Sequence, residues 1–383
     1  MSAHDRRRQG MVLVIVLVFA LLLVSSIATF LRRATIDSFV VRNRDAAARA
    51  EALARGGVEL GIALLLEDRL EEEASAEGGF RVESLFDPWA RVAELDLDVG
   101  EGASLRLEIE DAGARLNLNA LVVDGEEPPA PDAGGAPEVG NTEADAESFL
   151  RDFLEKVIEE MPGRPEQKNY DVEELVLNLM DWVDADETRR RGGLEDESYQ
   201  GRTPPYRAAN QRLLSVDELR LVQGFDGKLV DALAPYVGVF PLAPKDGGDG
   251  EAAPGLGVNP NTAPSWVLAL LYHGDPVGGR ELAKADEVAA IVKEREKHLL
   301  CAKEGGDSSN EDTEDGALTS EACLALLEAA DVDPSTIFPP PTWESDFFTV
   351  AAEASVGEIR RRLEVVVDRS DPTDVRRLAW RMR

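Results

Sequence analysis

The sequence predicts an α+β protein in which a long N-terminal helix packs on a small antiparallel sheet, with a large, mainly helical domain inserted into one loop of that sheet. Three observations support this fold class. An uncharged apolar run and an alanine-rich segment without proline follow each other near the N-terminus. Strand-like alternation occurs in two groups, one near residue 105 and one beyond residue 347. The residues between these groups have mainly helical patterns.

The first 31 residues combine a basic leader with an apolar helix. Three arginines precede Gln9 and Gly10, and residues 11–31 carry no charge. As a helix, such a segment rises about 32 Å at about 1.5 Å per residue, which is enough to cross a hydrocarbon core of about 30 Å. Three interpretations compete: a signal anchor, a signal peptide cleaved after Ser26-Ile27-Ala28, in which the first and third residues are small, and a prepilin leader cleaved after Gly10.

Residues 32–75 predict that the same helix continues outside the membrane. They contain no proline, and small or apolar residues recur at steps of three and four from Ala47 to Leu65. Small side chains allow another helix to approach closely. The candidate helix-packing residues are Ala47, Ala50, Ala54 and Gly57.

Two groups of strands are predicted on either side of the insertion. Leu105, Leu107 and Ile109 alternate with charged residues, which is the period of a half-buried strand. Strand character returns in three later segments, at residues 347–353, 359–368 and 375–381. We infer one sheet built from segments far apart in the sequence.

Acidic or glycine-rich linkers delimit the predicted insertion. Residues 124–147 carry eight acidic residues, four prolines, four glycines and no Lys or Arg, a composition that cannot bury enough apolar surface to fold. The expected organisation is a leader (1–10), a transmembrane helix (11–31), its continuation (32–75), the first part of the sheet (76–123), an acidic linker (124–147), a first helical subdomain (148–244), a linker (245–257), a second helical subdomain (258–340) and the second part of the sheet (341–383).

An acidic turn follows the helix that is predicted over residues 173–182. Carboxylates alternate through residues 181–187, and three more acids follow at 195–197 after a Gly-Gly pair. Alternating carboxylates in a turn can converge on one hard cation, as calcium sites require. The spacing does not fit an EF-hand, and a solvated loop that caps helices is the alternative interpretation.

A second motif, Val-Asn-Pro-Asn-Thr-Ala-Pro at residues 258–264, precedes an apolar helix predicted over 266–271. We expect Thr262 to cap that helix and Pro264 to lie in its first turn. With a further helix predicted over 287–295, the pair resembles helix-hairpin-helix or SAM-like units. Because the surroundings are acidic, a scaffold role is favoured over nucleic-acid binding.

Composition narrows the classes of function. The chain has 74 Asp and Glu against 41 Lys and Arg, a formal net charge of −33, which argues against a phosphate-binding surface and predicts no nucleic-acid partner. The three histidines are scattered, and no nucleotide-binding or hydrolase motif occurs, so neither a zinc cluster nor an enzyme is predicted. Cys301 and Cys323 bracket an acidic segment. They are expected to form one disulfide, contributing on the order of 3 kcal/mol, or to stay as two thiols.

Taken together, these motifs resemble the general secretion pathway protein K family, the large minor pseudopilins of the bacterial type II secretion system. Singly each motif is weak, but their order along the chain is specific. The segments that carry the resemblance are Gln9–Gly10 before Met11, Ala54–Glu59, Asp111–Asn119, Asp181–Asp186, Leu214–Leu219 and Val258–Pro264.

Ile15 adds to this resemblance. Most pseudopilins have a glutamate as the fifth mature residue, and counting from Met11 that position here is Ile15. An intramembrane carboxylate is costly and is retained where it pairs with a partner, such as the N-terminal amine of an adjacent subunit. A subunit without this carboxylate needs no further subunit above it in the filament, which indicates a position at the tip. A plain signal anchor would also have no glutamate there, so Ile15 has weight only in combination with the motifs.

The resemblance implies a pilin-like sheet, an inserted SAM-like domain and a non-enzymatic assembly role at the pseudopilus tip. Prepilin peptidase would cleave between Gly10 and Met11 and methylate the Met11 amine. The chain would be anchored in the inner membrane with its body in the periplasm. The implied partners are the minor pseudopilins I and J, whose helices would pack along the small residues, and the outer-membrane secretin or an exoprotein.

The resemblance also implies calcium as the bound cofactor. The ligands it suggests are Asp184, Asp186, Glu187, Glu195 and Asp196. Two other functions stay open at this point: a minor pilin of a type IV pilus, and an envelope-anchored helix-hairpin-helix protein that handles DNA.

Overall fold

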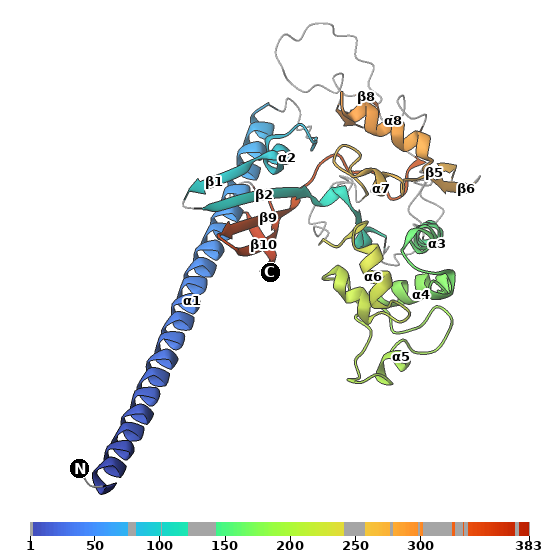
Figure 1. The fold of residues 1–383 in the computed structure, drawn as a ribbon. Coiled ribbons are helices and arrows are strands. Elements are labelled where there is room, and N and C mark those ends of the chain that lie inside the picture. The colour runs from blue at the N-terminus through green and yellow to red at the C-terminus, as the bar shows by residue number, and fades with distance from the viewer. Residues whose placement is uncertain are drawn as a thin grey trace.

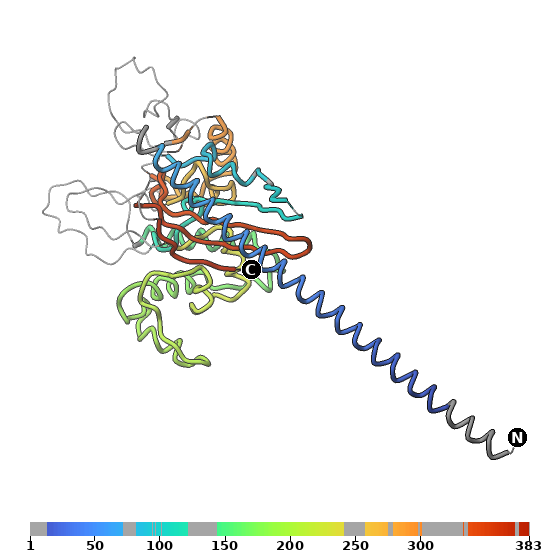
Figure 2. The backbone as a smooth tube through the Cα atoms, turned by 90° about the vertical axis from the view of Figure 1, so that its left-hand side faces the viewer, coloured from blue at the N-terminus to red at the C-terminus, as the bar shows by residue number. Residues whose placement is uncertain are grey.

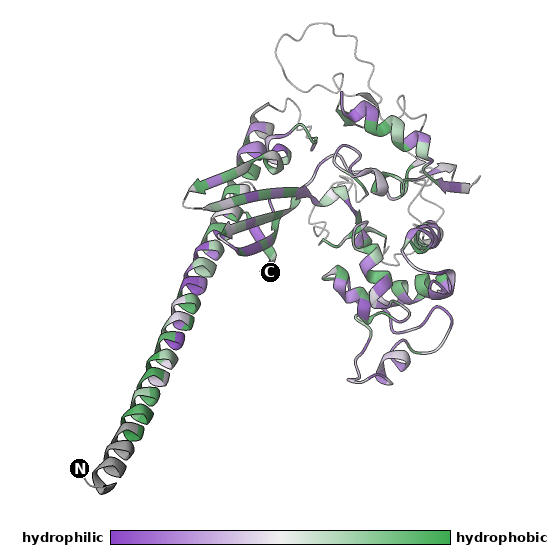
Figure 3. Ribbon diagram, in the orientation of Figure 1, coloured by the Kyte–Doolittle hydropathy of each residue, from purple (hydrophilic) through white to green (hydrophobic). Residues whose placement is uncertain are grey.

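The computed structural model describes residues 3–75, 82–100, 102–121, 143–240, 257–275, 279–297, 299–301, 324–325, 332, 336–371 and 375–382. A single helix, α1 (Ala3–Ser75), extends from the N-terminus into the body of the molecule (Figure 1). Among the described residues it is the one helix that is long and apolar enough to cross a membrane. Residues 14–45 are exposed, and this half of α1 projects from the body as a mainly apolar rod (Figures 2 and 3).

The C-terminal half of α1 packs on an antiparallel sheet of five strands in the order β1-β2-β9-β10-β11. Two strands come from before the insertion and three from after it. The alternation predicted β2 and the three later strands, but not β1. The strands are β1 (Asp96–Gly100), β2 (Ala103–Asp111), β9 (Phe347–Val356), β10 (Ile359–Asp368) and β11 (Arg376–Met382).

Close packing between α1 and the sheet depends on small residues of the helix. A Cβ atom on Gly61 would lie 2.6 Å from Cγ1 of Val350, so only glycine allows this approach. Around it, Val58 and Leu65 are buried with Leu107 in one apolar core. Each such side chain contributes about 1.5–3 kcal/mol by leaving water. Two short elements, α2 (Pro88–Arg91) and η1 (Val92–Glu94), cover the β2 side of the same core.

The insertion lies between β2 and β9 and has an apolar core of its own, in which Phe149, Phe153 and Trp182 are nearly inaccessible to solvent. It stands beside the sheet in Figure 1. The predicted fold class is thus confirmed, although a hairpin of β5 and β6 was not predicted. Its elements are η2 (Ala112–Ala114), β3 (Leu116–Asn117), η3 (Leu118–Ala120), α3 (Glu143–Glu160), η4 (Pro165–Gln167), α4 (Val172–Val183), α5 (Glu197–Gln200), η5 (Val216–Leu221), α6 (Gly227–Leu233), β4 (Val237–Gly238), α7 (Ser265–Leu268), β5 (Tyr272–Asp275), β6 (Gly279–Leu282), α8 (Ala285–Arg295), β7 (Leu300–Cys301) and β8 (Leu324–Ala325).

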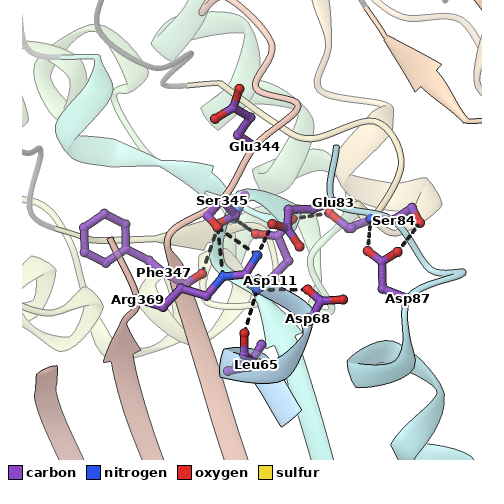
Figure 4. A network of polar contacts seen from close by, with 12 residues as sticks. Leu65, Asp68, Glu83, Ser84, Asp87, Asp111, Glu344, Ser345, Phe347 and Arg369 are labelled. Atoms are coloured by element: carbon purple, nitrogen blue, oxygen red, sulfur yellow. Dashed lines mark hydrogen bonds and ion pairs between the residues drawn. The ribbon is translucent and has the colours of Figure 1, made fainter. Parts of the chain in front are cut away.

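A buried arginine joins the sheet to the end of α1. Arg369 is fully buried, and its guanidinium donates to the Asp68 carboxylate at 2.9 Å and to the backbone carbonyl of Leu65 at 3.0 Å (Figure 4). It also pairs with Glu83 and lies over the ring of Phe348, 4.4 Å from its centroid. One cation therefore links α1, the segment after it and the sheet.

The motif at residues 258–264 lies at the junction between the sheet and the insertion. The side-chain amide of Asn259 donates to Asp111 Oδ2 at 3.1 Å and to the Glu83 carbonyl at 3.2 Å. The hydroxyl of Thr262 donates to the same Asp111 oxygen at 2.6 Å. The prediction that Thr262 caps a helix was wrong: α7 has Pro264 as its N-cap, because the hydroxyl is already engaged by a buried carboxylate.

Candidate functional site

An acidic site forms where α4 ends. Asp181 lies in the last turn of α4, and Asp184 is the residue at its C-cap. The chain then turns back through Gly192 and Gly193, both with positive φ, which brings Glu195 beside the end of the helix. Carboxylate oxygens of Asp181, Asp184 and Glu195 lie within 4.8 Å of one another. Three acids that are separated in sequence thus converge on one point.

Several oxygens at this point are buried without a hydrogen-bond partner. They are Oδ1 of Asp184, both carboxylate oxygens of Glu195, and the side-chain oxygen of Asn210. Asn210 has a positive φ of 45°, which asparagine tolerates better than most residues, and its backbone NH donates to the Trp182 carbonyl at 3.0 Å. A set of buried oxygen atoms with unused lone pairs is the donor set that a hard cation requires.

The electrostatics of the site also favour a cation. Burial, followed by the charges of Asp184, Asp181 and Asp186, raises the pKa of Glu195 to about 7, with a small opposing effect from Asn210. The pKa of Asp184 is raised as well, chiefly by burial. The cluster therefore holds more negative charge than its surroundings compensate.

Arg190 supplies part of that compensation. Its guanidinium donates to Asp181 Oδ1 at 3.0 Å and to Asp184 Oδ2. These contacts leave Oδ1 of Asp184 and both carboxylate oxygens of Glu195 without a hydrogen bond. The residues Asp181, Asp184 and Glu195 can hold a metal ion.

The structure brings together only some of the predicted ligands. Asp184 and Glu195 meet, but the Asp186 carboxylate accepts from the backbone NH of Thr188 at 2.6 Å, and Glu187 is exposed. Asp196 accepts from the backbone NH of Ala208 at 3.1 Å and lies outside the cluster, beside a pocket of about 320 Å³.

Two contributors to the acidic site were absent from the predicted ligand set. Asp181 belongs to the same acidic run and would have been found by the helical spacing that places it next to Asp184. Asn210 lies in a separate loop, and no pattern in the sequence connects it with the acidic turn.

The small residues of α1 lie against the chain's own sheet. Ala50 and Ala54 are fully buried and Ala47 is half-buried. A Cβ atom on Gly57 would lie 2.8 Å from Cδ1 of Leu105. The close approach that these residues allow is therefore, for most of them, an approach to the sheet.

The structure describes some of the remaining predicted residues but not all of them. Gly10 and Met11 lie within the backbone of α1, and Ile15, further along it, is exposed. Cys301 ends β7, whereas Cys323 lies outside the described residues, so the predicted disulfide does too.

Comparisons with known proteins agree on one family. Residues 114–242 match the family model "Type II secretion system (T2SS), protein K". The type II secretion system protein K of Pseudomonas aeruginosa is 28% identical over 339 residues, which cover 85% of this chain and 78% of that protein. The protein K of Aeromonas hydrophila is 29% identical over 238 residues, covering 62% of this chain and 65% of that protein.

The fold has a solved counterpart. A chain in the crystal structure of the GspK-GspI-GspJ complex from the enterotoxigenic Escherichia coli type 2 secretion system superposes with a TM-score of 0.55 at 19% identity. The superposition covers 90% of this chain and 99% of that one. In the relatives from E. coli, A. hydrophila and Klebsiella pneumoniae, the match spans 43%, 65% and 63% of the relative's own length. The matched family model and these relatives thus agree that the chain is similar to type II secretion system protein K.

Proposed function

We propose that this chain is a minor pseudopilin that caps or initiates the periplasmic pseudopilus tip of a type II secretion system. It acts as a non-enzymatic assembly component. The observation that supports this most directly is the continuous helix α1, whose exposed apolar half projects from a body where the same helix packs on an antiparallel sheet. Such a helix anchors the chain in the inner membrane and leaves the body in the periplasm.

The partners follow from the family. The solved counterpart is part of a GspK-GspI-GspJ complex, and we infer that this chain assembles with the corresponding pseudopilins I and J of its own system. Prepilin peptidase acts first, between Gly10 and Met11. With Ile15 in place of the glutamate, no subunit is expected above it. The insertion is then free to contact the secretin or an exoprotein.

Calcium is the metal that best fits the acidic site. All of the unsatisfied donor atoms there are carboxylate or amide oxygens, which calcium prefers, and no thiolate or imidazole is among them. Asp181, Asp184, Glu195 and Asn210 would hold the ion. By neutralising the cluster, the ion would fix the acidic turn to the end of α4, and so fix the shape of one end of the insertion.

The test of this function is the N-terminus of the protein as it occurs in membranes of its native host. Intact mass and N-terminal sequencing are expected to show a chain that begins at N-methylated Met11. A chain that starts at Met1, or at Thr29 after signal-peptide cleavage, would contradict the pseudopilin function.

Deletion of the gene should abolish release of exoproteins while their export to the periplasm continues. Loss of pili with normal secretion would instead support the type IV pilus alternative.

A further inference from the structure

On the face of the sheet against which α1 packs, the edge strand β11 is not covered by the helix. β11 is the edge strand next to β10, and in the ladder Trp380 lies opposite Val365 while Met382 lies opposite Leu363. Directly opposite residues share one face of a sheet, so these two side chains lie on the α1 side. Trp380 is nonetheless 70% exposed.

Between α1 and β11 there is a groove of about 290 Å³. Its lining includes Val58 and Glu59 from α1, Val365 from β10, and Trp380 and Met382 from β11. A helix is about 10 Å wide and strands lie about 4.8 Å apart, so α1 covers about two strands. The groove is the position that the next helix on this face would take.

The rim of the groove is basic in an otherwise acidic protein. β11 contains three arginines and no acidic residue, and Arg55 lines the opposite wall. Arg55 pairs with Glu51 and Arg377 with Glu59, each at 2.7 Å, and all four side chains are more than two-fifths exposed. Exposed pairs of this kind contribute about 0–1 kcal/mol, so a partner's carboxylate can replace the internal one at little cost.

The exposed half of α1 leads into this groove. Residues 14–45 of α1 are exposed on every side, and Arg55 at the groove follows a few turns later on the same helix. A helix from a neighbouring subunit that starts in the same membrane and runs parallel to α1 therefore reaches the floor formed by Trp380 and Met382. Buried tryptophan and arginine side chains are the ones that most often dominate interface energies.

We propose that the groove between α1 and β11 is the docking site for the N-terminal helix of a neighbouring pilin-like subunit, with an apolar stripe toward Trp380 and acidic residues toward Arg55 and Arg377. This rests on the proposed function, because it requires pilin-like neighbours in the same membrane. A second copy of this chain does not fit. Residues 32–55 of its own helix carry six arginines against three acids, so its helix would place like charges together.

The test is site-specific photocrosslinking in the full-length chain, expressed in its native host. A photoreactive amino acid replaces Trp380 and, in a matched control, Trp266 of the insertion, which is 51% exposed. The expected result is an adduct at position 380, absent at 266, whose partner peptide maps to the N-terminal helix of another pseudopilin. An adduct with a strand of that subunit or with a second copy, or no adduct at 380 while the partners co-purify, would overturn the proposal and leave the proposed function intact.

A second variant measures how much the surface contributes to binding. Because Trp380 is exposed, Trp380→Ala is expected to fold normally and to reduce co-purification of the partner at least tenfold, whereas Trp266→Ala retains it. Equal recovery with both variants would overturn the docking site alone. If the unaltered chain recovers no pilin-like partner from detergent-solubilised membranes, the docking site and the proposed function fail together.

Discussion

Two buried acidic clusters in this protein are neutralised in different ways. At the junction of α1 and the sheet, Asp68 and Glu83 surround Arg369, which is fully buried and donates to both. At the end of α4, Asp181 and Asp184 share Arg190, which is partly exposed and donates no hydrogen bond to Glu195. The first cluster surrounds a fully buried cation and keeps one buried carboxylate oxygen without a hydrogen bond, Oε2 of Glu83. The second keeps three such oxygens, Oδ1 of Asp184 and both of Glu195, and these carboxylates can hold a metal ion.

The largest effect is expected from removing the central cation of the first cluster. Arg369→Met leaves two buried carboxylates without their partner, which costs about 3–5 kcal/mol in comparable buried pairs. Urea denaturation of the full chain in detergent should show a large drop in the midpoint or a failure to fold. Arg377→Met, at the exposed pair with Glu59, is the control and should change stability by less than about 1 kcal/mol. Equal effects of the two variants would show that the buried position of Arg369 adds nothing to the stability that its ion pairs provide.

The second cluster should respond to calcium instead. An ion at a hundred times its dissociation constant stabilises the folded state by about 2.7 kcal/mol, and this gain should disappear in Asp184→Asn and Glu195→Gln. Thermal unfolding in calcium and in chelator measures it. Glu197→Gln, an exposed acid two residues away, should keep the full response. A calcium response that survives in Glu195→Gln would show that the ion binds elsewhere.

The calcium-free protein should lose stability as pH rises. The pKa of Glu195 is raised to about 7 in the folded state from an ordinary value near 4.5. The folded state therefore holds this proton more tightly than the unfolded state does. The stabilisation is fully present below about pH 4.5 and is lost as pH rises through about 7. Denaturation midpoints at pH 5 and pH 8 in chelator should differ, and Glu195→Gln should reduce the difference. Saturating calcium should reverse the trend, since binding requires the carboxylate.

The sequence was informative where a feature is periodic and local. The alternation of Leu105, Leu107 and Ile109 predicted β2, because a strand with one buried face must alternate. The acidic run indicated the site of Asp184. Asn210 could not be predicted as part of the acidic site. Its position beside the end of α4 depends on how a separate loop folds back, and no local sequence pattern indicates that. The small residues of α1 were predictable as a close-packing surface, but the sequence could not distinguish a partner's helix from the chain's own sheet.

The smallest effect is expected at Thr262, which was predicted to cap a helix and instead donates to Asp111 at the junction. Thr262→Val removes one hydrogen bond to Asp111, but that carboxylate still accepts from Gly113 and Asn259, so the cost should be only about 1–2 kcal/mol. A cap and a junction contact would both be destabilised by this change, so the size alone does not separate them.

The two roles of Thr262 are separated by a double-mutant cycle with Asp111→Asn. If the hydroxyl stabilises the junction, the two changes are coupled and the double variant loses less than the sum of the single ones, by at least about 0.5 kcal/mol. If the hydroxyl only caps α7, the two costs add. Thr262→Ser, which keeps the donor, should retain most of the stability in either background that contains Asp111. Additive costs would show that the Thr262 hydroxyl does not stabilise the junction, and would leave Asn259 to connect the insertion to the sheet.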